Sequence, residues 1–150
     1  INQRSSGGEP AADIVVRSSR LHGTKIGGAL IPRLIDELPI IAVAALFAEG
    51  ETVIRDAAEL KVKESDRIAA VTDEFKKCGA DITATDDGMI IRGGKPLHGA
   101  KFTTRGDHRM AMSLTVLAQM AEGTSELDDA ACVSVSYPSF FEDIYKLDNN

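Results

Sequence analysis

Residues 61–67 concentrate charge directly ahead of an amphipathic helical pattern. The segment holds three basic and two acidic side chains, and apolar residues follow at helical spacing from Ile68 onward. The N-terminus of a helix already carries partial positive charge and unpaired N–H groups. Lys63 and Arg67 add to that field instead of cancelling it. We therefore expect a bound anion to balance these charges.

Two further helix starts carry a similar mixture of charges. Residues 33–37 precede one apolar helical segment, and residues 105–109 precede another. If equivalent units pack side by side, these starts share one face of the domain with Lys63 and Arg67. Arginine suits such a face because its planar guanidinium pairs bidentately with phosphates and carboxylates. The candidate site residues are Asp36, Lys63, Glu64, Arg67, Asp107, His108 and Arg109.

Each candidate also has an ordinary structural interpretation. Asp36 and Asp107 suit the N-cap position of a helix, where a carboxylate accepts bonds from backbone N–H groups. Glu64 could pair with Lys61 in solvent, as surface carboxylates commonly do. His108 could be a partly buried histidine without a catalytic role. Taken one at a time, these residues do not establish a function.

The composition excludes several classes of partner. The net charge of −6 argues against nucleic acid and against an acidic membrane surface. The longest apolar run, residues 38–48, is too short to cross a bilayer. Two cysteines without metal-ligand spacing favour a reduced, cytoplasmic location. Because the first residue is Ile1 and not methionine, we expect the chain to be a piece of a longer protein.

The hydrophobic pattern predicts an α/β domain over residues 1–150. Helices are expected where apolar residues recur every three to four positions, and strands where they alternate. Apolarity on all sides predicts that the first helix is buried. The expected helices span 38–48, 67–77, 108–121 and 139–147, with Ser65 or Asp66 as the cap of the second. The expected strands span 14–18, 52–55, 81–85, 89–92, 101–104 and 125–127, of which 81–85 and 89–92 form a hairpin.

An internal repeat follows from comparing the chain with itself at an offset of 73 residues. Residues 48–58 are identical to residues 121–131 at six of eleven positions. The first unit contains strand, helix, strand, helix, strand and strand in that order, and the second stops before its final hairpin. We therefore expect one domain with an internal repeat at about 30–94 and 101–150.

Three segments together closely resemble the C-terminal half of the 5-enolpyruvylshikimate-3-phosphate synthase family: residues 32–39, 60–67 and 107–112. The flanks at 8–14 and 136–141 also look like that family, so the resemblance covers essentially the whole chain. It implies an inside-out α/β enolpyruvyl transferase fold of repeated βαβαββ units with buried helices. It also implies that this chain is one wall of a cleft, and that the missing N-terminal domain is the other.

The resemblance further implies the reaction and the role of each residue. Family members transfer the enolpyruvyl group of phosphoenolpyruvate to the 5-hydroxyl of shikimate 3-phosphate and release phosphate, without a metal or organic cofactor. By resemblance, Asp36 accepts the hydroxyl proton and Glu64 handles the proton at the methylene carbon. Lys63 resembles the lysine that binds shikimate 3-phosphate, and Arg67 and Arg109 resemble the arginines that bind phosphoenolpyruvate.

The remaining positions leave alternatives open. Asp107 and His108 have supporting roles by resemblance, Asp107 both capping its helix and orienting its neighbours. Some family members carry a phosphate-contacting lysine where this chain has Val135, so another cation substitutes here or the phosphate is bound differently. The rival interpretations are a relative that acts on UDP-N-acetylglucosamine and a noncatalytic anion-binding module. We expect the chain alone to be inactive, because a cleft needs two walls.

Overall fold

Short strands and helices make up an α/β fold along residues 2–6 and 9–148, the part of the chain that the computed structural model describes. The strands are β1 (Asn2–Ser6), β2 (Glu9–Asp13), β3 (Lys25–Ile26), β4 (Glu51–Ile54), β5 (Asp81–Thr85), β6 (Gly88–Arg92), β7 (Lys101–Phe102) and β8 (Glu126–Leu127). The α-helices are α1 (Ile31–Leu34), α2 (Leu38–Leu46), α3 (Arg67–Lys77), α4 (His108–Met120) and α5 (Phe140–Asp148). Short 3-10 helices lie at η1 (Gly28–Leu30), η2 (Ala58–Val62) and η3 (Ala131–Val135).

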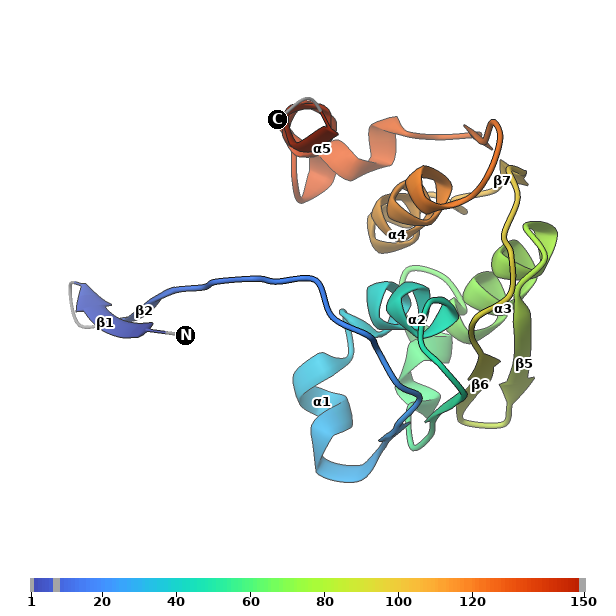
Figure 1. Ribbon diagram of the computed structural model, residues 1–150, viewed down its shortest axis with the longest axis horizontal. Helices are drawn as coiled ribbons and strands as arrows, with labels where there is room; N and C mark the ends of the chain where they lie inside the picture. Colours follow the sequence, from blue (N-terminus) through green and yellow to red (C-terminus); the bar gives the residue numbers. More distant parts are fainter. Residues whose placement is uncertain (1, 7–8, 149–150) are drawn as a thin grey trace.

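The main sheet has the strand order β3-β4-β6-β5. Helices α2 and α3 pack against this sheet (Figure 1). Strands β3 and β4 are parallel, whereas β6 is antiparallel to both β4 and β5. The expected hairpin is therefore confirmed, and so is the order helix, strand, helix, strand, strand from α2 to β6. The strand that precedes them is β3 and not the expected segment 14–18, and the short helix α1 lies between β3 and α2. Strands β7 and β8 form a separate parallel pair.

Three helices supply most of the core. Each turns a row of apolar side chains inward, and α2 also contacts both α4 and β6. The inward residues include Leu38, Ala42 and Leu46 of α2, Ile68, Val71 and Phe75 of α3, and Met110, Leu114 and Leu117 of α4. Because these helices pack on one another, the loops that precede them are brought together.

The beginning of α2 differs from the sequence prediction. Glu37 occupies the N-cap position without a side-chain bond to the helix, so Asp36 does not cap it. Pro39 lies in the first turn, where its missing N–H costs nothing. The helix is also not buried on all sides, since Ile40 is 38% exposed. Phe47, just past its last turn, is likewise 36% exposed.

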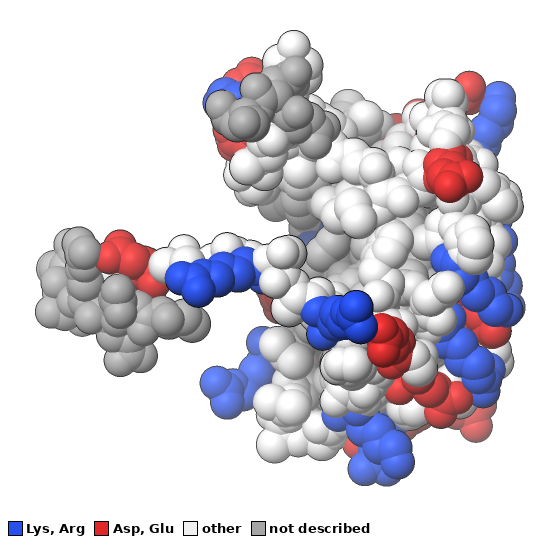
Figure 2. Space-filling model, in the orientation of Figure 1, with Lys and Arg blue, Asp and Glu red and all other residues white. Residues whose placement is uncertain are grey.

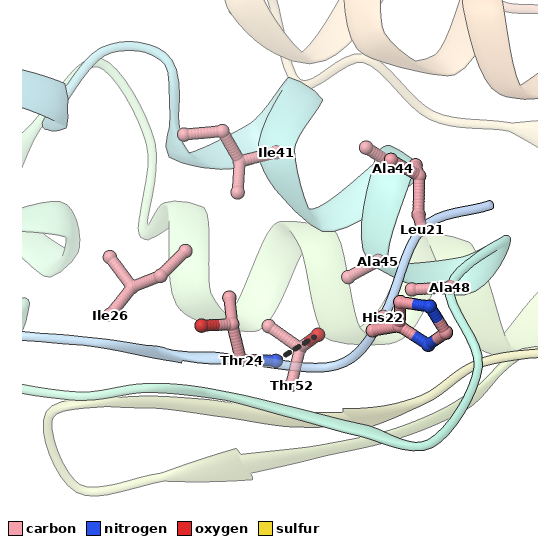
Figure 3. A pocket seen from close by; sticks show the side chains of 9 residues that line it. All are labelled: Leu21, His22, Thr24, Ile26, Ile41, Ala44, Ala45, Ala48 and Thr52. Carbon is pink, nitrogen blue, oxygen red and sulfur yellow. Dashed lines mark hydrogen bonds between the residues drawn. The ribbon is translucent and has the colours of Figure 1, made fainter. Parts of the chain in front are cut away.

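An open apolar hollow of about 160 Å³ lies between α2 and the edge strand β3 (Figure 3). Ile41 and Ala44 line it from the helix, and Leu21 and Ile26 line it from the segment around β3. The small alanine side chain leaves room there that a larger residue would fill. Below the hollow, the Thr24 backbone N–H donates to Thr52 Oγ1 at 3.4 Å.

The strand expected at 14–18 is wrong. Strand β2 ends at Asp13, and residues 14–21 run as an extended segment that joins the β1–β2 hairpin to the body (Figure 1). Val15 and Val16 are exposed. A strand requires a hydrogen-bonded neighbour, and no strand within 2–6 and 9–148 pairs with this segment.

The backbone around β3–β4 and around β7–β8 makes the same hydrogen bonds. Gly23 N–H donates to Glu49 O at 2.8 Å, and Gly99 N–H donates to Glu122 O at 2.7 Å. A Cβ on Gly23 would lie 2.2 Å from a backbone oxygen, and one on Gly99 would lie 2.1 Å from another. The predicted repeat at 30–94 and 101–150 stays a prediction. The equivalent hydrogen bonds involve Gly23 and Gly99, which precede the predicted starts of the two units at about residues 30 and 101.

Candidate functional site

Three loops meet where α2, α3 and α4 begin. The first carries Asp36, the second carries residues 63–67, and the third carries residues 107–109. Arg67 lies at their centre, with its side chain only 1% exposed. We call the group formed by Asp36, Glu37, Glu59, Lys63, Glu64, Ser65, Arg67, Asp107 and Arg109 the Arg67 cluster.

The loop at the start of α3 divides its polar side chains between two tasks. Asp66 is the N-cap, and its Oδ1 accepts from the Ala69 backbone N–H at 3.0 Å. Ser65 is therefore free to face the next loop, where its hydroxyl donates to Asp107 Oδ2 at 2.9 Å. The sequence left Ser65 and Asp66 as alternative caps, and the structure assigns that role to Asp66.

Asp107 forms the buried side of the cluster. Its carboxylate is fully buried and accepts from Arg67 Nε at 2.9 Å and from Arg67 Nη2 at 3.2 Å. The same carboxylate caps α4 by accepting from the backbone N–H groups of Arg109 and Met110. Burial by itself would raise the pKa of Asp107, but the hydrogen bonds and charge of Arg67 outweigh burial and lower it. Asp107 is therefore both the N-cap of α4, as expected, and a partner that holds Arg67 in position.

Two half-exposed carboxylates cover the other side of Arg67. Asp36 Oδ1 accepts from Nη1 at 2.9 Å, and Glu64 Oε2 accepts from Nη2 at 2.7 Å. Asp36 is 42% exposed and Glu64 is 50% exposed. Glu64 therefore pairs with Arg67, and the pairing with Lys61 considered from the sequence is not the one observed.

Lys63 and Arg109 flank these carboxylates and are more accessible than Arg67. Lys63 Nζ lies 3.1 Å from Glu59 Oε1 and 3.9 Å from Asp36 Oδ1. Arg109 Nη1 donates to Glu37 Oε1 at 3.3 Å and to the Asp36 backbone oxygen at 3.4 Å. Both basic groups retain solvent-facing surface beside Asp36, so both can reach a small anion there.

The remaining candidates lie around this centre. His108 is half-buried at the first position of α4, and Val135 is exposed at the end of η3. A cavity of about 210 Å³ opens beside Asp36 and Arg109 and is otherwise lined mainly by apolar groups, including Ile40, Met112, Val116, Tyr137 and Phe140. Within residues 2–6 and 9–148, no group of three His, Cys, Asp or Glu side chains is arranged to hold a metal ion. No helix in the same part of the chain is long and apolar enough to cross a membrane.

The Arg67 cluster is not the predominantly basic surface that the local sequence suggests. Its three basic side chains are accompanied by five carboxylates, because Asp36, Glu37 and Asp107 arrive from other loops. On the face of the molecule seen in Figure 2, basic and acidic residues lie interspersed beside a broad uncharged area, without one basic patch. Glu37 and Glu59 were not predicted as ion-pair partners. The i, i+4 spacing of Glu59 and Lys63 was a local signal for one pair, whereas no local signal indicates that Glu37 pairs with Arg109.

Comparisons with known proteins place this geometry in context. The model of the family described as EPSP synthase (3-phosphoshikimate 1-carboxyvinyltransferase) matches residues 4–144. A 3-phosphoshikimate 1-carboxyvinyltransferase of Thermosynechococcus vestitus is 61% identical over 93% of this chain and 32% of its own length. One from Listeria innocua is 60% identical over 95% of this chain and 33% of its own length. The chain thus spans about a third of these relatives.

Solved structures resemble the chain as well. An EPSP synthase from Acinetobacter baumannii superposes with a TM-score of 0.92 at 40% identity, over 97% of this chain and 34% of that one. The enolpyruvyl transferase NikO from Streptomyces tendae has a TM-score of 0.62 at 20% identity, over 97% of this chain and 32% of its own, which shows a shared fold alone. These likenesses confirm the α/β enolpyruvyl transferase fold class.

Proposed function

The chain belongs to the EPSP synthase (3-phosphoshikimate 1-carboxyvinyltransferase) family, and from that membership we propose the reaction in which it takes part. The protein that contains it transfers the enolpyruvyl group of phosphoenolpyruvate to the 5-hydroxyl of shikimate 3-phosphate and releases phosphate. This chain supplies one wall of the active-site cleft. The expected cytoplasmic location stays a prediction.

The chemistry requires two proton movements and the neutralisation of anions. The attacking hydroxyl loses a proton to Asp36, while the methylene carbon of phosphoenolpyruvate gains one through Glu64. A positioned acid or base typically contributes about 10²–10⁴-fold to such a step. Lys63, Arg67 and Arg109 hold the phosphate and carboxylate groups, which makes the second carbon of phosphoenolpyruvate more electrophilic. Asp107 positions Arg67, and His108 has a supporting role.

One observation carries the proposal: Asp36 and Glu64, from separate loops, both contact the buried guanidinium of Arg67. Two proton-transfer groups and three cations in one cluster suit a reaction that joins two anionic substrates. A noncatalytic anion-binding module would also need carboxylates beside a buried guanidinium, so substitution of the two carboxylates decides between the proposals. That rival predicts anion binding without any effect of Asp36→Asn or Glu64→Gln on turnover.

The remainder of the longer protein supplies the other wall, including the N-terminal domain. The isolated chain is therefore inactive. Steady-state phosphate release by the purified 150-residue chain with both substrates would contradict that statement.

A chimeric enzyme tests the function directly. Residues 4–144 replace the matching third of a full-length relative, and phosphate release is measured with phosphoenolpyruvate and shikimate 3-phosphate. We expect turnover, together with a loss of about 10²-fold or more in Asp36→Asn and in Glu64→Gln. Asp73→Asn is the matched control, because it removes an exposed carboxylate that pairs with Arg105 away from the cluster.

The same chimera separates the rival substrates. UDP-N-acetylglucosamine replaces shikimate 3-phosphate in a parallel assay, and we expect no phosphate release with it. A folded chimera that is inactive with shikimate 3-phosphate, or that keeps its rate in both variants, would overturn the proposed function. Circular dichroism and thermal melting establish that each protein is folded.

A further inference from the structure

The two carboxylates assigned to proton transfer also occupy the accessible side of Arg67. We propose that Asp36 and Glu64 hold the place of a substrate anion on this guanidinium and that the anion displaces them when it binds. Filling the site thus releases both carboxylates for proton transfer. This inference rests on the proposed function for the roles of the two residues.

Arg67 has a fixed side and a replaceable side. On the fixed side, Asp107 is fully buried, makes two bonds to the guanidinium and is held in turn by Ser65 and by the start of α4. On the replaceable side, Asp36 and Glu64 each make one bond and are about half exposed. The two outer carboxylates remain half hydrated, so either outer contact is exchanged for another anion more readily than the fully buried contact with Asp107.

Burial of Arg67 makes displacement necessary. Its side chain is 1% exposed, and its Nη1 and Nη2 atoms already donate to carboxylates. An incoming anion therefore reaches the guanidinium only where Asp36 or Glu64 leaves it. Lys63 and Arg109 lie beside Asp36 with solvent-facing surface, so they can hold the anion while the exchange takes place.

Displacement changes what the two carboxylates can do. While Asp36 Oδ1 accepts from Arg67, one of its lone pairs is engaged, and displacement frees that lone pair for a substrate hydroxyl. The same holds for Glu64 Oε2 and a proton destined for the methylene carbon. Substrate binding frees these oxygens at the moment they are needed, and the empty site keeps its buried arginine neutralised.

The test is whether removing the charge of Glu64 strengthens or weakens the binding of phosphoenolpyruvate. Phosphoenolpyruvate is titrated into the 150-residue chain, and its affinity is measured by NMR in the wild type, Glu64→Gln and Asp73→Asn. If Glu64 competes with the ligand, Glu64→Gln binds phosphoenolpyruvate roughly two- to fivefold more tightly than the wild type. Asp73→Asn removes the same charge from α3 without touching Arg67, so its affinity stays at the wild-type value.

A direct reporter accompanies the affinities. The ¹³C signal of the Glu64 side-chain carboxyl and the ¹H–¹⁵N signal of Arg67 Nε are followed during the wild-type titration. We expect both to move together and to saturate at the same phosphoenolpyruvate concentration. Unchanged or weaker binding in Glu64→Gln, or a Glu64 signal that does not move at saturation, overturns displacement.

The outcomes also separate this inference from the proposed function. If phosphoenolpyruvate shifts the NMR signals of Lys63 and Arg109 while the Glu64 signal does not move, displacement is refuted but the proposed function is not. The chimera assay then still decides the function. An absence of binding in every variant, with no change at Arg67 Nε, counts against displacement and against an anion site in this chain.

Discussion

Replacing Asp107 by asparagine should reveal how strongly the fold depends on the buried pair with Arg67. Both side chains are essentially inaccessible, and two hydrogen bonds of 2.9 and 3.2 Å join them. Asparagine has nearly the same shape and is an equally good N-cap, so α4 keeps its cap. The substitution therefore removes the negative charge that faces a buried guanidinium, and its NH2 group replaces the oxygen that accepts from Arg67 Nε, while the remaining oxygen still caps α4.

The expected magnitude follows from the partners that remain. Breaking a buried ion pair by removing one member costs about 3–5 kcal/mol, because the other charge is left uncompensated. Arg67 keeps Asp36 and Glu64 in the variant, so the loss lies near 3 kcal/mol, at the lower end of that range. Asp107→Ala should cost about 1 kcal/mol more, since it also removes the cap of α4.

Urea unfolding at pH 7 measures these free energies in the 150-residue chain. Wild type, Asp107→Asn and Asp107→Ala are compared with Asp66→Asn, which changes an exposed cap without an arginine partner. We expect Asp66→Asn to remain within about 0.5 kcal/mol of the wild type. A loss below about 1 kcal/mol in Asp107→Asn would refute the reasoning, because Arg67 would then not depend on this carboxylate for its burial.

Three further predictions concern pH, capping and backbone contact. The pKa of Asp107 is lower in the folded than in the unfolded state, so the stabilisation by its carboxylate is present above about pH 3.9 and is lost as the pH falls through the folded-state value. Urea unfolding at pH 5 and pH 3 should therefore show a smaller decrease in the free energy of unfolding on acidification in Asp107→Asn than in the wild type. Asp66→Ala should lower the free energy of unfolding by about 1 kcal/mol, because Ala69 N–H loses its acceptor, and Asp66→Asn should restore it. Gly99→Ala should lower the free energy of unfolding by at least about 1 kcal/mol in thermal unfolding, because its Cβ would lie 2.1 Å from the Thr124 backbone oxygen. Gly94→Ala is the control, since its Cβ would meet no atom within 4 Å and the variant tests only the effect of the positive φ.

Periodicity predicted the elements whose own residues determine them. The limits of α3 were correct because the cap Asp66, the apolar stripe and Gly79 are all local. The hairpin β5–β6 was correct for the same reason, since its turn and alternating residues lie within a dozen positions. Such signals require no knowledge of what the element packs against.

Elements that depend on distant partners were predicted less well. Residues 14–18 have a strand-like composition, but a strand forms only beside another strand. The cap assigned to Asp36 failed because Arg67, thirty-one positions away, engages its carboxylate. The equivalent backbone hydrogen bonds of Gly23 and Gly99 point to a second sequence similarity that was not used in the prediction. The similar sequences at 21–26 and 97–102 are 76 residues apart, so a comparison at an offset of 73 passes over them.

The charge of the site illustrates the same limit. Counting residues 61–67 alone suggests an excess of positive charge, and an anion was inferred to balance it. Burying a guanidinium is costly unless carboxylates accompany it, so a fold that buries Arg67 must bring acidic groups from other loops. Asp36 and Asp107 are those groups. On the displacement that we propose, an anionic substrate meets a site that is already neutralised, and its binding depends on how readily Asp36 and Glu64 leave Arg67.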